Sequence, residues 1–233
     1  MSATATSSSS SSSLPYPDPT NNRVNFKLDA ARIHLDRLIE LERNSPEQSL
    51  ALTIERFQVE MEIDEILYYL VGVKDALLQE INRRFDLGLE LRTVDIDTIN
   101  KQLKKKYGGD IAREMLSEIN RMTSSREDPL WLINECHNHS KHREMLGMAK
   151  TMVIGGPTNA SLIDPRTGQG VRRANGTQKP PVEYLEESYV EIEKLQKKVR
   201  DKINSYFTAV LFKQGFSQTT YLLGLSSLRQ TAF

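Results

Sequence analysis

Apolar residues recur every three or four positions along most of the chain, which is the spacing that places side chains on one face of an α-helix. This pattern predicts a first helix over residues 26–43 and a long second helix over residues 46–86. Residues 45–48, Ser-Pro-Glu-Gln, form a capping-box sequence at the start of the second helix. At 1.5 Å per residue that helix would be about 60 Å long, so a break within residues 49–53 is an open alternative.

Three or four further helices follow from the same spacing. A helix over residues 93–107 ends at a pair of glycines, and Asp110 is in position to cap the next one. A central helix over residues 128–147 has an N-cap aspartate, a proline at its first position and a glycine at its end. The last main helix covers residues 182–214, where the apolar positions follow a heptad-like stripe.

Three segments depart from the helical pattern. Residues 1–22 are rich in serine and proline and predict a disordered tail, and residues 216–233 form a C-terminal tail without a clean period. Residues 150–178 combine a β-branched run with a turn sequence at 164–168, which predicts an insert with a β-hairpin across that turn. We therefore expect one domain over residues 23–215: an all-α, up-and-down bundle of five to six helices with a small β-hairpin-like insert.

Composition adds limits rather than a function. Lysine plus arginine equals aspartate plus glutamate at 31 each, so no global field attracts nucleic acid or an acidic membrane, and any anion site must be local. The single cysteine excludes an intramolecular disulfide and favours a reducing compartment. The start lacks a secretory signal, and no apolar run reaches the roughly 18 residues of a membrane-spanning helix. We predict a cytoplasmic protein without a membrane partner.

The central helix carries the unusual chemistry, because three of the four histidines, the only cysteine and the only tryptophan lie in residues 128–147. Cys136, His139 and His142 are spaced three apart, but Cys136 and His142 lie about 120° apart around the helix, which makes the trio poor co-ligands of one metal. Cys136 as a nucleophile would need a base such as His137 or His139. A lone helical cysteine is more often a buried apolar residue, and we predict no metal and no cofactor.

Two charge clusters each have a structural and a functional interpretation. On the long helix the clustered carboxylates are Glu60, Glu62, Asp64 and Glu65. Paired carboxylates serve acid–base chemistry or metals, but on a long helix they more often form a solvated face. At the end of the 93–107 helix the clustered cations are Lys104, Lys105 and Lys106. They either complement the helix macrodipole or steer a phosphate.

The segment from Trp131 to Arg143 resembles the signature of the HEPN superfamily (higher eukaryote and prokaryote nucleotide-binding). The motif of that family is an arginine, a polar residue, three arbitrary residues and a histidine, and similar members place a tryptophan and a glutamate before it. The residues in matching positions are Glu135, Asn138, His142 and Arg143, and the first three share one helical stripe with Trp131. His137 occupies the arginine position. The resemblance covers the core helices and the last helix.

The resemblance implies a helical bundle that commonly dimerises with its motif at the interface, and metal-independent RNA cleavage. His142 would act as general acid or base, with Asn138 one turn away to orient it. His137 is no substitute for an arginine, since a neutral imidazole has no bidentate fork, and losing such a clamp costs about 10²- to 10³-fold in rate. A protonated His137, an inward Arg143, or a cation from a second subunit are the three conceivable replacements.

Three functions remain open from the sequence. The first is a metal-independent endoribonuclease, whose catalytic residues would be Glu135, His137, Asn138 and His142. The second is a catalytically impaired HEPN-like protein that binds RNA or a protein partner, with RNA contacts at Arg143, Lys141, Lys104, Lys105 and Lys106. The third is a structural or interaction bundle with no activity. The expected partners are a second copy of the chain, RNA or another protein, in a toxin or defence setting that the resemblance alone implies.

Overall fold

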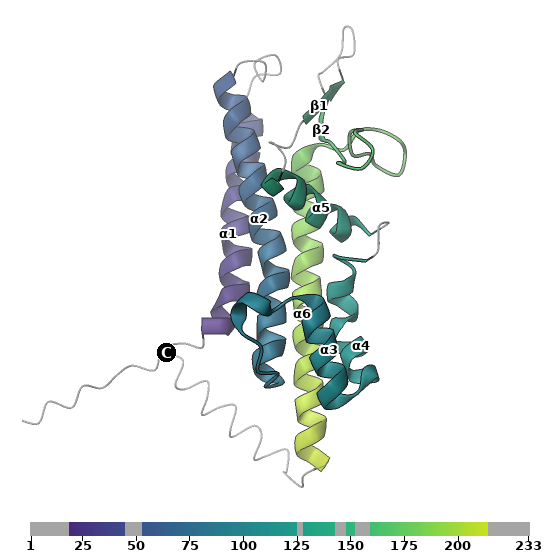
Figure 1. The fold of residues 1–233 in the computed structure, drawn as a ribbon. Helices are drawn as coiled ribbons and strands as arrows, with labels where there is room; N and C mark the ends of the chain where they lie inside the picture. Colours follow the sequence, from purple (N-terminus) through teal and green to yellow (C-terminus); the bar gives the residue numbers. More distant parts are fainter. Residues whose placement is uncertain (1–18, 45–52, 125–127, 143–147, 152–158, 214–233) are drawn as a thin grey trace, which may run out of the picture.

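Three long helices form the body of the molecule, which we describe from a computed structural model. The described residues are 19–44, 53–124, 128–142, 148–151 and 159–213. Helices α1 (Pro19–Asn44) and α2 (Thr53–Arg84) pack side by side along their length, and α6 (Pro181–Lys213) runs against both of them. Figure 1 shows these three helices as the long axis of the bundle.

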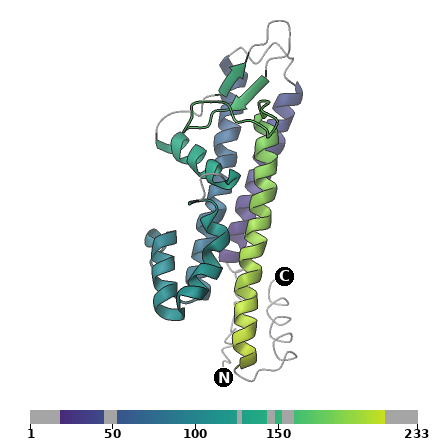
Figure 2. The same cartoon turned by 90° about the vertical axis from the view of Figure 1, so that its right-hand side faces the viewer.

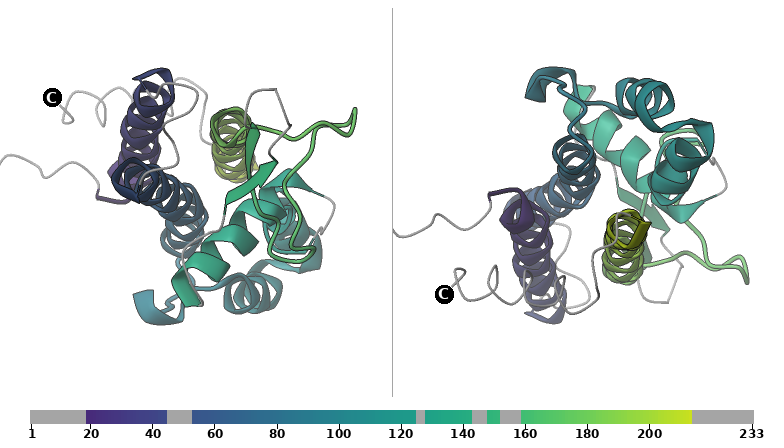
Figure 3. Two further views of the ribbon diagram at one scale, coloured as in Figure 1. Left: turned by 90° about the horizontal axis from the view of Figure 1, so that it is seen from above. Right: turned by 90° about the horizontal axis from the view of Figure 1, so that it is seen from below.

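Three shorter helices complete the bundle. Their bounds are Ile96–Tyr107 for α3, Gly109–Asn120 for α4 and Pro129–His142 for α5, and a single 3-10 turn, η1, covers Leu91–Thr93. Helices α3 and α4 pack together as a hairpin beside the lower part of α6 (Figure 2). Helix α5 lies across α2 and α6, as the end views of Figure 3 show. The prediction of an all-α bundle is confirmed.

The core lies where α1, α2 and α6 meet. Leu35 of α1, Leu70 and Leu77 of α2, and Val199 of α6 are fully buried, as expected from the periodicity of the sequence. Among the described residues, no helix has both the length and the apolar character needed to cross a membrane.

Helix ends were predicted with mixed success. The start of α5 is as predicted, because Asp128 Oδ1 accepts the amide of Leu130 at 2.9 Å. The predicted cap at Asp110 is wrong, since the N-cap of α4 is Gly108, at φ 99°, and the helix begins two residues earlier than predicted. Helix α3 begins at Ile96 with a capping box between Asp95 and Thr98, not at residue 93.

The long helices also differ from their predicted bounds. Helix α1 begins at Pro19, several residues before the predicted residue 26. Helix α2 is described from Thr53, and residues 45–52, which include the predicted capping box and most of the alternative break, lie outside the described part. Residues 19–22, which were predicted to belong to the disordered tail, are part of α1 instead. The rest of that tail and residues 216–233 lie outside the described residues, so the domain limits stay a prediction.

The insert is small and partly β-structured. Strand β1 (Met148–Thr151) pairs antiparallel with β2 (Asn159–Leu162), with Met148 opposite Leu162. The predicted turn at 164–168 is present, with Gly168 at φ 66°, but it closes only a single bridge between Ile163 and Gly170. The hairpin therefore precedes the turn that was expected to form it.

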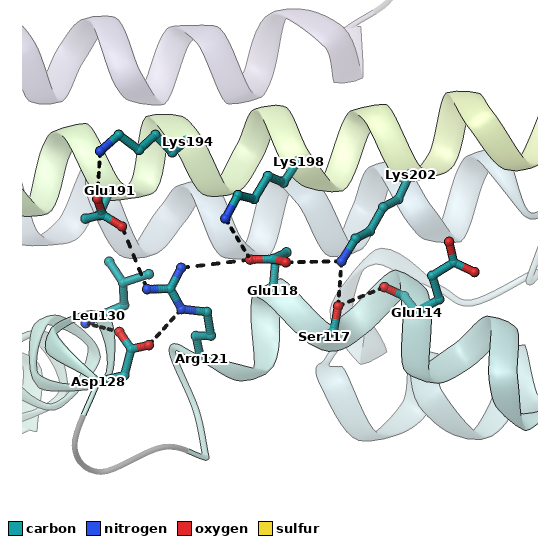
Figure 4. A network of polar contacts seen from close by, with 10 residues as sticks. All are labelled: Glu114, Ser117, Glu118, Arg121, Asp128, Leu130, Glu191, Lys194, Lys198 and Lys202. Carbon is teal, nitrogen blue, oxygen red and sulfur yellow. Dashed lines mark hydrogen bonds and ion pairs between the residues drawn. The ribbon is translucent and has the colours of Figure 1, made fainter.

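A network of charged side chains fixes the start of α5 against α4 and α6 (Figure 4). Arg121, just after α4, donates from Nε to Asp128 Oδ2 at 2.7 Å and lies 3.7 Å from Glu191 of α6. Glu118 of α4 accepts from Lys202 of α6 at 3.1 Å. Because Asp128 also caps α5, the position of that helix depends on this network.

Candidate functional site

Helix α5 presents different chemistry on its different faces. Ile133 and Cys136 are fully buried, and Glu135 is half-buried, whereas Asn138 is exposed. At 100° per residue, His137 and Asn138 point about 100° apart. The structure therefore does not bring His137 onto the stripe that carries the other motif residues. The side chains of His142 and Arg143 lie outside the described residues, so their predicted roles stay predictions.

His137 instead lines a groove of about 360 Å³ between α1, α2 and α5, which we call the α5 groove. Its lining includes Arg23, Phe26 and Lys27 from α1, Tyr68, Gly72, Asp75 and Gln79 from α2, and His137 and Lys141 from α5. The imidazole of His137 lies 6.0 Å from the ring of Tyr68, centroid to centroid. Of the predicted site residues, His137 and Lys141 are thus brought together.

Lys27 crosses the middle of the α5 groove. Its Nζ lies 4.1 Å from the ring centroid of Tyr68 and 4.9 Å from that of Tyr69, which are cation–π distances. The side chain reaches this place over Gly72, where an added Cβ would come within 2.9 Å of Lys27 Cε. The absence of a side chain at Gly72 therefore makes room for Lys27 of α1 to lie against α2.

The charges of the α5 groove favour anions. Arg23, Lys27 and Lys141 supply three cations against one carboxylate, Asp75. The side chain of Asp75 is 62% exposed and lies 3.9 Å from Lys74 Nζ. Lys74 itself donates to Asn134 of α5 at 3.0 Å, so the pairing with Asp75 is loose. This local excess of positive charge exists although the whole chain is neutral.

Three of the four clustered carboxylates of α2 are not on a solvated face, which corrects the favoured interpretation for them, whereas Glu65 is exposed as that interpretation expected. Glu60 is buried, Glu62 Oε2 lies 2.6 Å from His34 Nδ1 of α1, and Asp64 accepts from Ser140 of α5 at 2.8 Å. Burial raises the pKa of Asp64 above its usual value; the Ser140 hydrogen bond opposes the rise, and nearby carboxylates add to it. These groups connect α2 to its neighbouring helices.

An arginine from the insert approaches the motif stripe of α5 at its first turn. The guanidinium carbon of Arg166 lies 4.8 Å from the ring centroid of Trp131, and its Nη2 donates to Asp164 at 2.6 Å. The hydrogen bond from Arg166 lowers the pKa of the Asp164 carboxyl. The hydrogen bond to Asp164 raises the pKa of the Arg166 guanidinium, burial opposes the rise, and the charges of Asp164 and Glu135 add to it. The insert is thus attached to α5 through the only tryptophan.

Cys136 is unsuited to nucleophilic catalysis. Its side chain is fully buried, and burial first, then the charges of Asp164 and Glu135, raises the pKa of its thiol to about 12. Since the thiolate is the reactive form, a thiol that stays protonated at neutral pH is inert. Within the described part of the chain, no three His, Cys, Asp or Glu side chains lie close enough to hold a metal.

The three lysines at the end of α3 lie outside the α5 groove as it is described. Lys106 Nζ donates to the backbone carbonyl oxygens of Phe85 at 3.2 Å and Asp86 at 2.5 Å. It thereby satisfies carbonyls at the end of α2, which is a structural role. Lys104 and Lys105 are exposed.

Sequence reasoning missed Arg23, Lys27 and Arg166, the cations that the fold adds to the surroundings of α5. The two from α1 reach the groove only through the packing of α1 on α2, for which the sequence carries no local signal. One indirect signal existed in the sequence, because a glycine inside a strongly helical pattern, such as Gly72, often has a packing reason.

No protein-family model, curated protein or solved structure matches the chain.

Proposed function

We propose that the chain is an RNA-binding protein of HEPN-like type, which holds a single-stranded segment in the α5 groove. The observation that carries the proposal is the convergence of three cations, from α1 and α5, on one groove with an aromatic side. Single-stranded nucleic acid binds to cationic grooves that also offer aromatic rings for base stacking. Tyr68 is half exposed and serves this second purpose.

Binding is better supported than cleavage. RNA cleavage needs an acid–base group next to a charge clamp and a residue that orients it. The α5 groove contains His137 and cations, but Glu135 and Asn138 lie on other faces of α5. The proposal therefore favours the catalytically impaired member of the family that the resemblance implies.

The test is fluorescence anisotropy with a short labelled single-stranded RNA at several salt concentrations in EDTA. We expect Lys27→Ala and Lys141→Ala each to weaken binding and to reduce the salt slope by about 0.7 per lost phosphate contact. Lys197→Ala, at an exposed lysine of α6 outside the groove lining, is the matched control and should change little. Equal losses for the control and the groove variants would contradict the proposal, and RNA cleavage abolished by His142→Ala would establish the nuclease instead.

We also propose the homodimer that the resemblance implies. Exposed apolar side chains on α1 and α2, among them Phe26, Ile33, Phe57 and Met61, are consistent with an interaction surface beside the groove. Sedimentation of the full chain should give twice the monomer mass, and Phe57→Glu together with Met61→Glu should return the monomer mass. A monomer at all accessible concentrations would refute this part of the proposal.

A further inference from the structure

Four groove residues follow one line along α2, because Tyr68, Gly72, Asp75 and Gln79 are separated by steps of four, three and four. At 1.5 Å per residue this line is about 16 Å long, enough for more than one nucleotide. Tyr68 stands at one end and Lys27 crosses at Gly72. Asp75 and Gln79 occupy the other end, where they form a polar pair.

Arg23 fixes the orientation of Gln79. Arg23 Nη1 donates to Gln79 Oε1 at 2.6 Å. Because a guanidinium has no acceptor, the amide oxygen must face Arg23, and the amide NH₂ of Gln79 must point elsewhere as a donor. The end of the groove therefore offers a carboxylate as a double acceptor at Asp75 and an amide donor one turn away.

The Asp75 carboxylate is exposed at the groove and repels phosphates, so it is better suited to another part of an RNA. We propose that Asp75 reads a base, and that the α5 groove selects an unpaired guanine. The Watson–Crick edge of guanine carries two adjacent N–H donors, N1 and N2, beside the acceptor O6. Asp75 accepts the two donors, and the amide of Gln79 donates to O6.

The other bases present the wrong edge to this pair. Cytosine and adenine each place an acceptor beside their amino group, which would face the second carboxylate oxygen of Asp75. Uracil has a single N–H between two carbonyl oxygens, and one of these would also face the carboxylate. In the guanine complex, the phosphate next to the bound base lies near Lys27 and the adjacent base stacks on Tyr68.

The inference rests on the proposed RNA binding, and one experiment separates the two. Anisotropy is measured with an all-uridine RNA and with the same RNA carrying one guanosine, which avoids guanine-rich structures. We expect the guanosine RNA to bind roughly 5- to 150-fold more tightly, the range for a bidentate base contact. Replacing guanosine with inosine, which lacks the 2-amino group, should remove part of that preference.

The Asp75→Asn variant should change the affinity for the guanosine RNA, and the direction of that change depends on the role of the carboxylate. If Asp75 reads guanine, the variant binds the guanosine RNA more weakly and the all-uridine RNA as well as or better than before. If Asp75 is only a repelling charge, the variant binds both RNAs more tightly, which would overturn the inference. Asp110→Asn removes an exposed carboxylate far from the groove lining and is the matched control.

The remaining outcomes are also decisive. Equal binding of the two RNAs by the unmodified protein would overturn guanine selection while leaving RNA binding intact. Full affinity for the inosine RNA would overturn the bidentate contact. Failure to bind either RNA would remove the proposed function together with the inference. Far-UV circular dichroism of each variant confirms that its helices have formed.

Discussion

Gly72→Ala tests the α5 groove without removing any charged group. A Cβ at residue 72 would lie 2.9, 3.0 and 3.1 Å from Lys27 Cε, Cδ and Nζ. Ordinary contact between such atoms needs about 3.5–4.0 Å, so the lysine side chain must move by roughly 0.5–1 Å away from α2. The ammonium then leaves its position over the rings of Tyr68 and Tyr69.

The stability of the protein should change little. Alanine in place of glycine inside a helix stabilises it by about 0.5–1 kcal/mol, whereas the lost cation–π contact costs about 0.5–1 kcal/mol at an exposed site. The two terms have opposite signs and similar size, so urea unfolding should give nearly the same free energy. RNA binding should nevertheless weaken by about tenfold, because a charge-assisted contact contributes about 1.5 kcal/mol or more.

The measurement is a double-mutant cycle by anisotropy on the proteins carrying Gly72→Ala, Lys27→Ala, and both. If Gly72 acts through Lys27, the double variant loses no more affinity than Lys27→Ala alone. If the affinity losses of the two single variants add in full in the double variant, Gly72 does not act through Lys27. An unchanged RNA affinity of the Gly72→Ala protein would also refute the idea that Gly72 makes room for the Lys27 side chain.

Three further predictions concern the surroundings of α5. Arg121→Ala should lower the free energy of unfolding by about 1–3 kcal/mol in urea titration, because Asp128 and its neighbours lose their shared partner, whereas the exposed Arg113→Ala should change it by less than about 0.5 kcal/mol. Cys136 should resist thiol reagents at pH 8 until urea is added, because a pKa of about 12 leaves a thiolate fraction of about 10⁻⁴ at that pH; rapid labelling of the folded protein would contradict this burial. Arg166→Ala should expose the only tryptophan, Trp131, giving red-shifted emission and stronger acrylamide quenching, and an unchanged spectrum would mean that the insert contact contributes nothing to its burial.

The sequence was sufficient for the helices and for the start of α5. Asp128 and Pro129 define that start by local chemistry, and Leu130, Ile133 and Cys136 define the buried face by their spacing. Such features depend on residues within a few positions of one another. They are therefore available before any tertiary contact is known.

The predictions that failed concern features that tertiary contacts or the backbone conformation of a neighbouring residue determine. The carboxylates Glu62 and Asp64 were expected to face solvent. Instead, Glu62 contacts His34, which lies 28 residues away in the chain. Asp64 contacts Ser140, which lies 76 residues away. Asp110 matched a capping pattern, but the positive φ of Gly108 lets the helix begin two residues earlier. A local pattern cannot choose between such alternatives when tertiary packing decides.

The question raised by His137 has changed as a result. From the sequence alone, the missing arginine of the motif left three replacements: a protonated His137, Arg143 or a cation from a second subunit. The fold offers Lys27 and Lys141 on the side of His137 instead, and Arg166 on the side of Glu135. Positive charge is therefore present on two faces of α5, while Glu135 and Asn138 of the motif are not among the residues that line the groove. Charge without that alignment can hold a phosphate but gives little rate enhancement, which is why we propose that the groove binds RNA and does not cleave it.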